Sequence, residues 1–81
     1  MKLPRDIGGE ELCKVLSKLG YEVTRQSGSH VRLTTKEKGE HHITIPRHSP
    51  LKPGTLNAIL TEIADHLQMT KKDLLQFLVE E

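Results

Sequence analysis

Aromatic side chains are nearly absent from this chain of 81 residues, which contains one tyrosine, one phenylalanine and no tryptophan. Its core must therefore be aliphatic. The single cysteine, Cys13, excludes an internal disulfide and any zinc site that needs several cysteines, and its place in a helical run favours a small core residue. No apolar run is long enough to span a membrane or resembles a signal peptide, so we expect one cytoplasmic domain over residues 1–81.

Charge is unevenly distributed along the chain, although the formal net charge is only +1. Residues 25–52 contain six lysines and arginines against two glutamates, and residues 53–81 contain two lysines against five acids. Four of the five histidines also lie between residues 30 and 48. A polyanion such as nucleic acid is a plausible partner for this middle segment, although an ordinary solvated hairpin could carry the same charges.

Hydrophobic periodicity predicts the order helix, three antiparallel strands, helix and short last helix. A helix is expected over residues 10–19, ended by Gly20, and a second from about Pro53 to Leu67. Strands are expected from residue 21, over 30–35 and over 41–45, with a turn at 27–29 and Pro46 ending the last strand. Thr70 resembles the N-cap of the last helix.

These elements give an α+β fold in which the three-stranded sheet packs on the two main helices. The sheet residues expected in the core are Val23, Val31, Leu33, Ile43 and Ile45. The last helix is expected to pack through Leu74, Leu75, Phe77 and Leu78.

The turn Gly28-Ser29 places His30 at the start of the second strand. Because side chains alternate along a strand, His30, Arg32 and Thr34 are expected on the face opposite the core. An unperturbed histidine has a pKa of about 6.5, so it can accept and release a proton near neutral pH. This arrangement indicates proton-transfer chemistry on an anionic substrate.

The other histidines are ambiguous from sequence. His41 and His42 point to opposite faces of one strand, so they cannot both line one site, and structural roles are favoured for both and for His66. His48 suits a second proton carrier or phosphate contact as well as it suits a structural role. A zinc site formed by His30, His42 and His48 is conceivable, but no cysteine ligand or helical histidine spacing supports it.

An ordered set of short motifs covers nearly the whole chain from Leu12 onward. The set comprises Gly20-Tyr21, Gly28-Ser29-His30, His42, Pro46, His48, Leu51-Lys52-Pro53-Gly54-Thr55-Leu56 and Ile59-Leu60. With these motifs the chain resembles the HicA family, also called YcfA-like proteins, which are small toxins of prokaryotic toxin–antitoxin pairs.

The resemblance implies a fold like that of double-stranded-RNA-binding domains, with the order α-β-β-β-α. It implies an mRNA interferase, an endoribonuclease that needs no metal or other cofactor and uses one catalytic histidine, here His30. It also implies an antitoxin of the HicB kind that covers the active face. We therefore expect a monomer when the protein is free and a hetero-oligomer with the antitoxin.

The residues expected to hold RNA are basic or belong to the turn before His30. They are Gly28, Ser29, Arg25, Arg32, Lys36, Lys38 and Lys52, with His48 as a possible auxiliary residue. Only two acids, Glu37 and Glu40, lie between residues 23 and 61, which leaves few ligands for Mg²⁺. The alternatives are a non-catalytic RNA-binding module of the same fold and a protein that only binds a protein partner.

Overall fold

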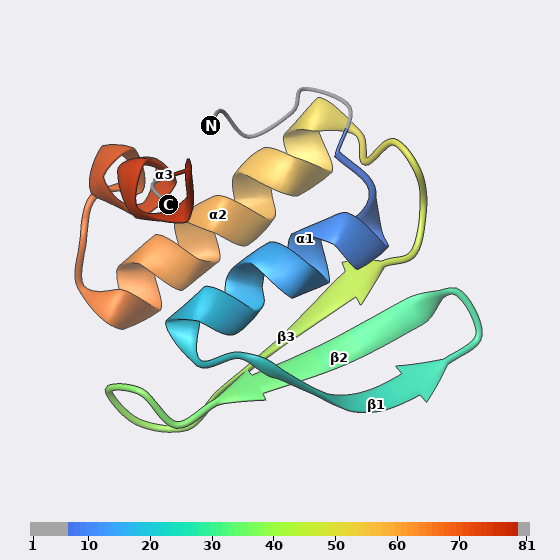
Figure 1. Ribbon diagram of the computed structural model, residues 1–81, viewed down its shortest axis with the longest axis horizontal. Helices are drawn as coiled ribbons and strands as arrows, with labels where there is room; N and C mark the ends of the chain where they lie inside the picture. The colour runs from blue at the N-terminus through green and yellow to red at the C-terminus, as the bar shows by residue number, and fades with distance from the viewer. Residues whose placement is uncertain (1–6, 80–81) are drawn as a thin grey trace.

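The computed structural model describes residues 7–79, which form a three-stranded antiparallel sheet and three α-helices (Figure 1). The elements are α1 (Gly9–Leu16), a 3₁₀ turn (Ser17–Leu19), β1 (Glu22–Ser27), β2 (His30–Thr35), β3 (His41–Pro46), α2 (Pro53–Leu67) and α3 (Lys71–Val79). This order confirms the predicted α+β class, the α-β-β-β-α arrangement and the additional short helix.

The strands follow one another in the sheet in the order β1-β2-β3, so β1 and β3 are its edges. All three helices lie on one side of the sheet, and the outer face carries no element of residues 7–79 (Figure 1). In β2 and β3 the side chains alternate between buried and solvent-facing positions. The alternation confirms that His30 and Arg32 lie on the outer face, opposite Val31 and Leu33.

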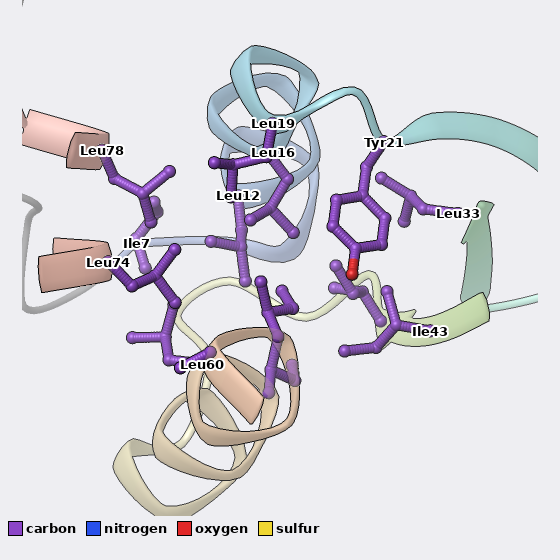
Figure 2. Packing of buried hydrophobic residues seen from close by; sticks show 14 of the residues in the cluster. Ile7, Leu12, Leu16, Leu19, Tyr21, Leu33, Ile43, Leu60, Leu74 and Leu78 are labelled. Atoms are coloured by element: carbon purple, nitrogen blue, oxygen red, sulfur yellow. The ribbon is translucent and has the colours of Figure 1, made fainter. Parts of the chain in front are cut away.

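The core lies between the inner face of the sheet and the helices (Figure 2). Its main members are Val31, Leu33, Ile43 and Ile45 from the sheet and Leu12, Leu16, Ile59, Leu60 and Ile63 from the helices. Tyr21 is only 1% exposed, and Figure 2 shows its ring beside Leu33. Because almost every core member is aliphatic, close packing of branched side chains supplies the hydrophobic stabilisation.

The prediction that Val23 belongs to the core is wrong, because this side chain is 50% exposed. Val23 pairs with Leu33, but every residue of β1 is exposed, since the helices do not cover this edge strand. The register also shifts between Val23 and Arg25, and such a bulge bends an edge strand away from its neighbours.

The predicted helix ends are confirmed by backbone geometry. Gly20 adopts the left-handed conformation with φ of 83°, directly after the 3₁₀ turn that tightens the end of the first helix. The hydroxyl of Thr70 accepts a hydrogen bond of 3.0 Å from the backbone N–H of Asp73, as an N-cap does.

Phe77 does not pack in the core as predicted, because its side chain is 46% exposed. The buried face of α3 is formed by Leu74 and Leu78, and Phe77 lies on its flank beside Met69 and Leu67 in a shallow surface hollow. Helical spacing allows only one stripe of α3 to face α2, and Phe77 falls outside it.

Cys13 lies half-buried against the core, in agreement with its predicted role as a small packing residue. Burial raises the pKa of its thiol, and the neighbouring Glu10 raises it further. The thiol is therefore held in its neutral, unreactive form. No helix within residues 7–79 has the length and apolar character that a bilayer crossing requires.

Candidate active site

His30 stands at the first position of β2, on the outer face of the sheet. Gly28 lies in the turn before β2 and has a φ of 59°, a backbone conformation that residues other than glycine and asparagine rarely adopt. The residue opposite His30 on β3 is Pro46. The ring of His30 is exposed, and its nearest polar contact is a long one of 3.4 Å from Nδ1 to the hydroxyl oxygen of Ser29.

His48 lies on the loop that leaves β3, and three backbone hydrogen bonds hold this loop against the rest of the fold. Arg47 N–H donates to the carbonyl of Ser29 at 2.6 Å, Gly9 N–H donates to the carbonyl of His48 at 2.9 Å, and Leu51 N–H donates to the carbonyl of Ile7 at 2.9 Å. The first bond joins the loop to the turn before His30. The other two join it to the start of α1.

Gly9 allows the close approach between α1 and this loop. A Cβ at this position would lie 1.9 Å from the carbonyl oxygen of Pro46, a distance that no real side chain tolerates. The loop that carries His48 therefore requires glycine at position 9.

His30, His48 and Lys52 line one hollow of about 440 Å³. The remaining lining residues are Pro46, Pro50, Leu51 and Thr55. The structure thus brings together the predicted catalytic histidine, the possible auxiliary histidine and one predicted cation, although His30 and His48 are separated by most of a hairpin in the sequence. Two imidazoles and an ammonium group can exchange protons with a bound anion and balance its charge.

Arg25 and Arg32 sit opposite each other on β1 and β2, directly beside the His30 position. Like charges in directly opposite positions destabilise a sheet, so a bound polyanion would relieve the repulsion between them. Both side chains are exposed. The pair extends the positive charge of the hollow along the outer face.

Lys36 and Lys38 lie beyond the far end of β2, in the loop between β2 and β3. Six residues of extended chain separate His30 from Lys36, a distance of about 20 Å at the usual rise of a strand. These two lysines therefore do not join the hollow at His30, and they could contact only a more distant part of a long ligand.

Arg47 is a cation of the same region that is already paired. Its Nε donates to Oε1 of Glu10 at 3.0 Å, and its terminal NH2 group contacts the same oxygen. The pair joins the His48 loop to α1 a second time and makes Arg47 a support for the hollow.

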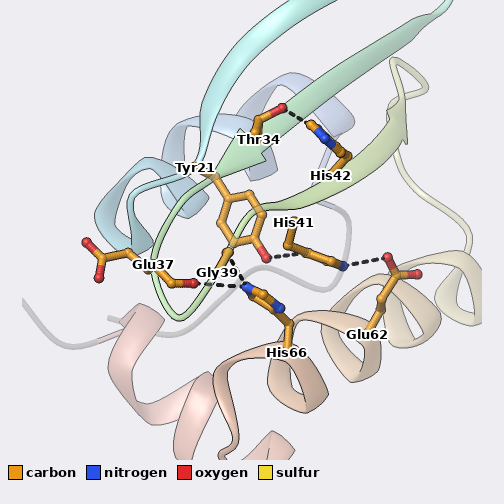
Figure 3. Close-up of polar contacts among 8 residues, drawn as sticks. All are labelled: Tyr21, Thr34, Glu37, Gly39, His41, His42, Glu62 and His66. Carbon is orange, nitrogen blue, oxygen red and sulfur yellow. Dashed lines mark hydrogen bonds and ion pairs between the residues drawn. The ribbon is translucent and has the colours of Figure 1, made fainter.

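His41 and His66 are held inside a polar cluster between β3 and α2 (Figure 3). His41 Nδ1 lies 2.7 Å from the hydroxyl of Tyr21, and its Nε2 lies 3.0 Å from Oε2 of Glu62. The His66 ring stacks on that of His41, with ring centroids 4.4 Å apart. Nε2 of His66 lies 2.9 Å from the carbonyl oxygen of Glu37 in the loop between β2 and β3. Both histidines therefore have the structural roles that the sequence favours.

Tyr21 keeps its hydroxyl proton in this cluster. Burial raises the pKa of Tyr21 to about 12, and the Glu62 carboxylate contributes to the rise. In the tautomer of His41 that has its proton on Nε2, the neutral phenol donates to Nδ1 and Nε2–H donates to Glu62.

His42 points to the outer face, opposite to His41, as predicted. Its Nδ1 lies 2.7 Å from the hydroxyl of Thr34, and its Nε2 lies 2.9 Å from Oε2 of Glu40. Both ring nitrogens are thus occupied by protein groups. Within residues 7–79 no three histidine, cysteine, aspartate or glutamate side chains converge on a point where they could hold a metal ion.

Several supports of the hollow carry little signal in the sequence. The pairing of Arg47 with Glu10 could be recognised only once the loop was placed against α1. The Gly8-Gly9 pair at the start of α1 is a signal that the sequence does contain. Consecutive glycines disfavour a helix, so their presence there indicates a place where another segment packs closely.

Comparison with known families gives one match. Residues 9–64 match the sequence model of a family described as HicA toxin of bacterial toxin–antitoxin. The matched segment runs from the start of α1 to near the end of α2 and so includes the whole sheet and the hollow at His30. Searches of curated proteins and of solved structures found no match.

Proposed function

The chain belongs to the HicA family of toxins, and we propose that it is an endoribonuclease that cleaves mRNA without a metal ion. The observation that carries this proposal is the hollow shared by His30, His48 and Lys52, at the end of a sheet face that also bears Arg25 and Arg32. A proton carrier beside cations is what transesterification of a phosphodiester requires.

In the proposed reaction the 2′-hydroxyl of the substrate is the nucleophile. His30 removes the proton of this hydroxyl, the 2′-oxygen forms a bond to phosphorus, and the bond from phosphorus to the 5′-oxygen breaks. The leaving 5′-oxygen takes a proton from His30 or from His48 across the hollow. The products are a 2′,3′-cyclic phosphate and a 5′-hydroxyl end, so atoms and charge balance without a further reactant.

The cations have a separate part in this mechanism. Lys52 faces the phosphate in the hollow, where its ammonium group stabilises the charge that grows on the non-bridging oxygens. Arg25 and Arg32 hold the neighbouring phosphates along the open face. Gly28 and Ser29 shape the turn that presents His30.

Membership in a toxin–antitoxin family implies an antitoxin as partner. We propose that this partner is a HicB-like protein that covers the outer face around His30 and Arg32. An acidic surface would suit this role, because it would neutralise the basic face and block access of a phosphate at the same time.

Cleavage of RNA in the presence of EDTA tests the proposed activity. We expect the native protein to cleave and to leave a 2′,3′-cyclic phosphate, and expression of the protein to arrest growth. His30→Ala should lower the cleavage rate by roughly 10²–10⁴-fold, the usual worth of a general acid or base. His48→Ala should lower it less if His30 carries both proton transfers.

The fold and RNA binding of each variant provide the control. An exposed histidine contributes little to packing, so the His30→Ala variant should have the same unfolding temperature as the native protein and should still bind RNA. Cleavage that stops in EDTA and returns with Mg²⁺ would contradict the mechanism. An unchanged cleavage rate in His30→Ala would contradict the assignment of this residue, and RNA binding without any cleavage by the native protein would indicate a binding module.

A further inference from the structure

A second depression, of about 580 Å³, continues from the hollow at His30 along the line where β3 meets α2. His30, Pro46 and Thr55 line both depressions, so the two are continuous. We call the second one the β3–α2 groove. A ligand held at His30 can extend into it without leaving the protein surface.

The walls of the groove combine apolar and polar groups in the manner of a small-molecule site. Ile43 from β3 and Ala58 and Ile59 from α2 provide an apolar wall. Thr44 and Thr55 provide hydroxyl groups beside that wall.

The backbone of β3 adds further hydrogen-bonding groups. This strand is an edge of the sheet, and an edge strand presents N–H and carbonyl groups that no neighbouring strand uses. An apolar wall beside such groups suits a flat heterocycle that buries its face and uses hydrogen bonds at its rim.

Charge changes sign along the continuous surface. The hollow contains the ammonium group of Lys52 beside His30 and His48, whereas the groove is lined by the carboxylate of Glu62 and by the imidazole of His42, whose Nε2 is paired with Glu40. Oε2 of Glu62 lies 3.0 Å from Nε2 of His41, and a carboxylate has about four acceptor sites, so Glu62 can accept further hydrogen bonds. Figure 3 shows this side chain projecting from α2 toward β3.

A carboxylate repels phosphate but accepts hydrogen bonds from the amino group of a nucleobase. We propose that the β3–α2 groove binds the base next to the cleaved phosphate of single-stranded RNA, with Glu62 as the residue that selects bases bearing an amino group. Cytosine, adenine and guanine have such a group, and uracil does not. This inference rests on the proposed function, which places the cleaved phosphate at His30.

Filling the groove tests binding without requiring catalysis. In the His30→Ala background, Ala58→Leu adds bulk inside the groove, and Asn57→Leu adds a similar apolar side chain at a neighbouring exposed position that does not line it. Affinity for a labelled single-stranded oligoribonucleotide is measured by fluorescence anisotropy at constant salt. Ala58→Leu should weaken binding about tenfold, which corresponds to roughly 1.4 kcal/mol, and Asn57→Leu should not. Equal affinities of the two variants would overturn the proposal.

Substituting Glu62 tests selection of the base. Glu62→Gln retains an oxygen that can accept from His41, and its amide adds a donor that uracil can use. Sequencing of cleavage ends should show that the native enzyme disfavours uridine at one position beside the cut and that Glu62→Gln loses this preference. Unchanged preferences at every position flanking the cut would overturn the role of Glu62.

The proposal and the function on which it rests fail in different ways. If His30→Ala abolishes cleavage while the groove variants bind and cut like their parents, the function stands and the groove has no such role. If the native protein cuts no RNA, the function fails, and NMR titration with the same oligoribonucleotide still tests the groove. Shifts at Thr44, Ala58 and Glu62 would support base binding there, and shifts confined to the outer face around Arg25 would overturn it.

Discussion

The neighbours of each histidine decide whether its ring can exchange a proton with a ligand. His41 and His42 use both ring nitrogens on protein groups, and His66 binds the carbonyls of the loop between β2 and β3. Within residues 7–79, the rings of His30 and His48 make no short hydrogen bond to another side chain and open into a hollow. These two rings are therefore the ones that a ligand in the hollow can reach.

Tyr21 gives a direct test of the cluster that holds His41. Its pKa is near 10 in an unfolded chain and about 12 in the fold, because burial and Glu62 disfavour the phenolate. The folded state thus binds the proton more tightly, and this contribution to the free energy of unfolding is complete below pH 10 and is lost as the pH rises through 12. Tyr21→Phe should cost roughly 1 kcal/mol at neutral pH through the lost hydrogen bond to His41.

The measurement compares urea unfolding of native protein and Tyr21→Phe at several alkaline pH values. The advantage of the native protein over Tyr21→Phe should shrink above pH 10 and reverse before pH 12, because a pKa raised from 10.0 to about 12 is worth more than one hydrogen bond, and other groups that titrate there cancel in this difference. Because Tyr21 is the only tyrosine of the chain, its near-ultraviolet phenolate absorbance reports the same titration without ambiguity. A phenolate that forms at the pH of free tyrosine would contradict the buried, hydrogen-bonded phenol.

The sequence predicts on which strand face part of the candidate site lies, but it does not predict the contacts of the loop after β3. Strand alternation put His30 and Arg32 on one face, and the structure confirms this because β2 is covered on one side only. The proximity of His48 and Lys52 to His30 could not be derived, since it depends on how the loop after β3 folds back on α1. In the sequence, Arg47 is one of the six basic residues of the segment 25–52, and only the tertiary structure shows its pairing with Glu10.

Arg32 and Lys38 differ in position, and this difference predicts different effects on RNA binding. Arg32 lies beside His30, whereas Lys38 lies in the loop at the far end of the sheet. For a short single-stranded oligoribonucleotide bound to His30→Ala protein, Arg32→Gln should reduce the slope of log affinity against log salt by about 0.7, the value for one lost phosphate contact. Lys38→Gln is the matched control and should leave the slope unchanged.

The outcome decides how far the RNA extends along the face. Equal reductions of the slope in the two variants would show that the ligand spans the whole sheet. A slope near zero for the parent protein would show that phosphate contacts do not drive binding.

At the scale of secondary-structure elements, the predictions succeeded where the apolar residues of a segment follow a single helical or strand period. Both β2 and α2 have the expected bounds, because their apolar residues follow one strand or helix period and turn residues flank them. Val23 and Phe77 were wrongly assigned for a common reason. Periodicity shows which residues lie on the same face of a helix or strand, but it does not show whether another element covers that face.

Gly9 and Gly54 are both helical glycines, yet their replacement by alanine should have opposite effects. At Gly9 a Cβ would collide with the carbonyl of Pro46, so Gly9→Ala should displace α1 or the His48 loop and cost roughly 1–3 kcal/mol, as overpacking does. At Gly54 nothing lies within 4 Å of a Cβ, so Gly54→Ala should leave stability unchanged or raise it by up to about 1 kcal/mol, the gain in helix propensity.

Thermal and urea unfolding measure both glycine effects, and cleavage assays add a functional reading. Because Gly9 holds the loop through its bond to the carbonyl of His48, Gly9→Ala should also slow cleavage at temperatures where the variant remains folded. A Gly9→Ala protein with native stability would show that α1 and the loop can separate at no cost, which the close contact in the structure argues against.

For the molecule as a whole, the sheet separates a packed inner face from an outer face that we propose as the binding side. The helices cover the inner face and bury an almost wholly aliphatic core, while the outer face and its margin with α2 carry the basic pair, the hollow and the β3–α2 groove. Core packing and the proposed ligand contacts therefore depend on different side chains. Substitutions on the outer face can change ligand binding while the core remains intact.

The position of the proposed binding side predicts how an antitoxin would inhibit the toxin. If a HicB-like protein covers the outer face, RNA and antitoxin must compete, and the charge of the face must contribute to the complex. Arg32→Glu should weaken the complex about tenfold or more, a loss of roughly 1.4 kcal/mol. Lys72→Glu makes the same charge change on α3, on the helix side of the molecule, and should leave the affinity unchanged.

Calorimetry with the protein encoded next to the toxin gene measures both affinities, and labelled RNA in a His30→Ala background measures competition. Complete RNA cleavage by native toxin saturated with this protein would show that inhibition does not occur by covering the face.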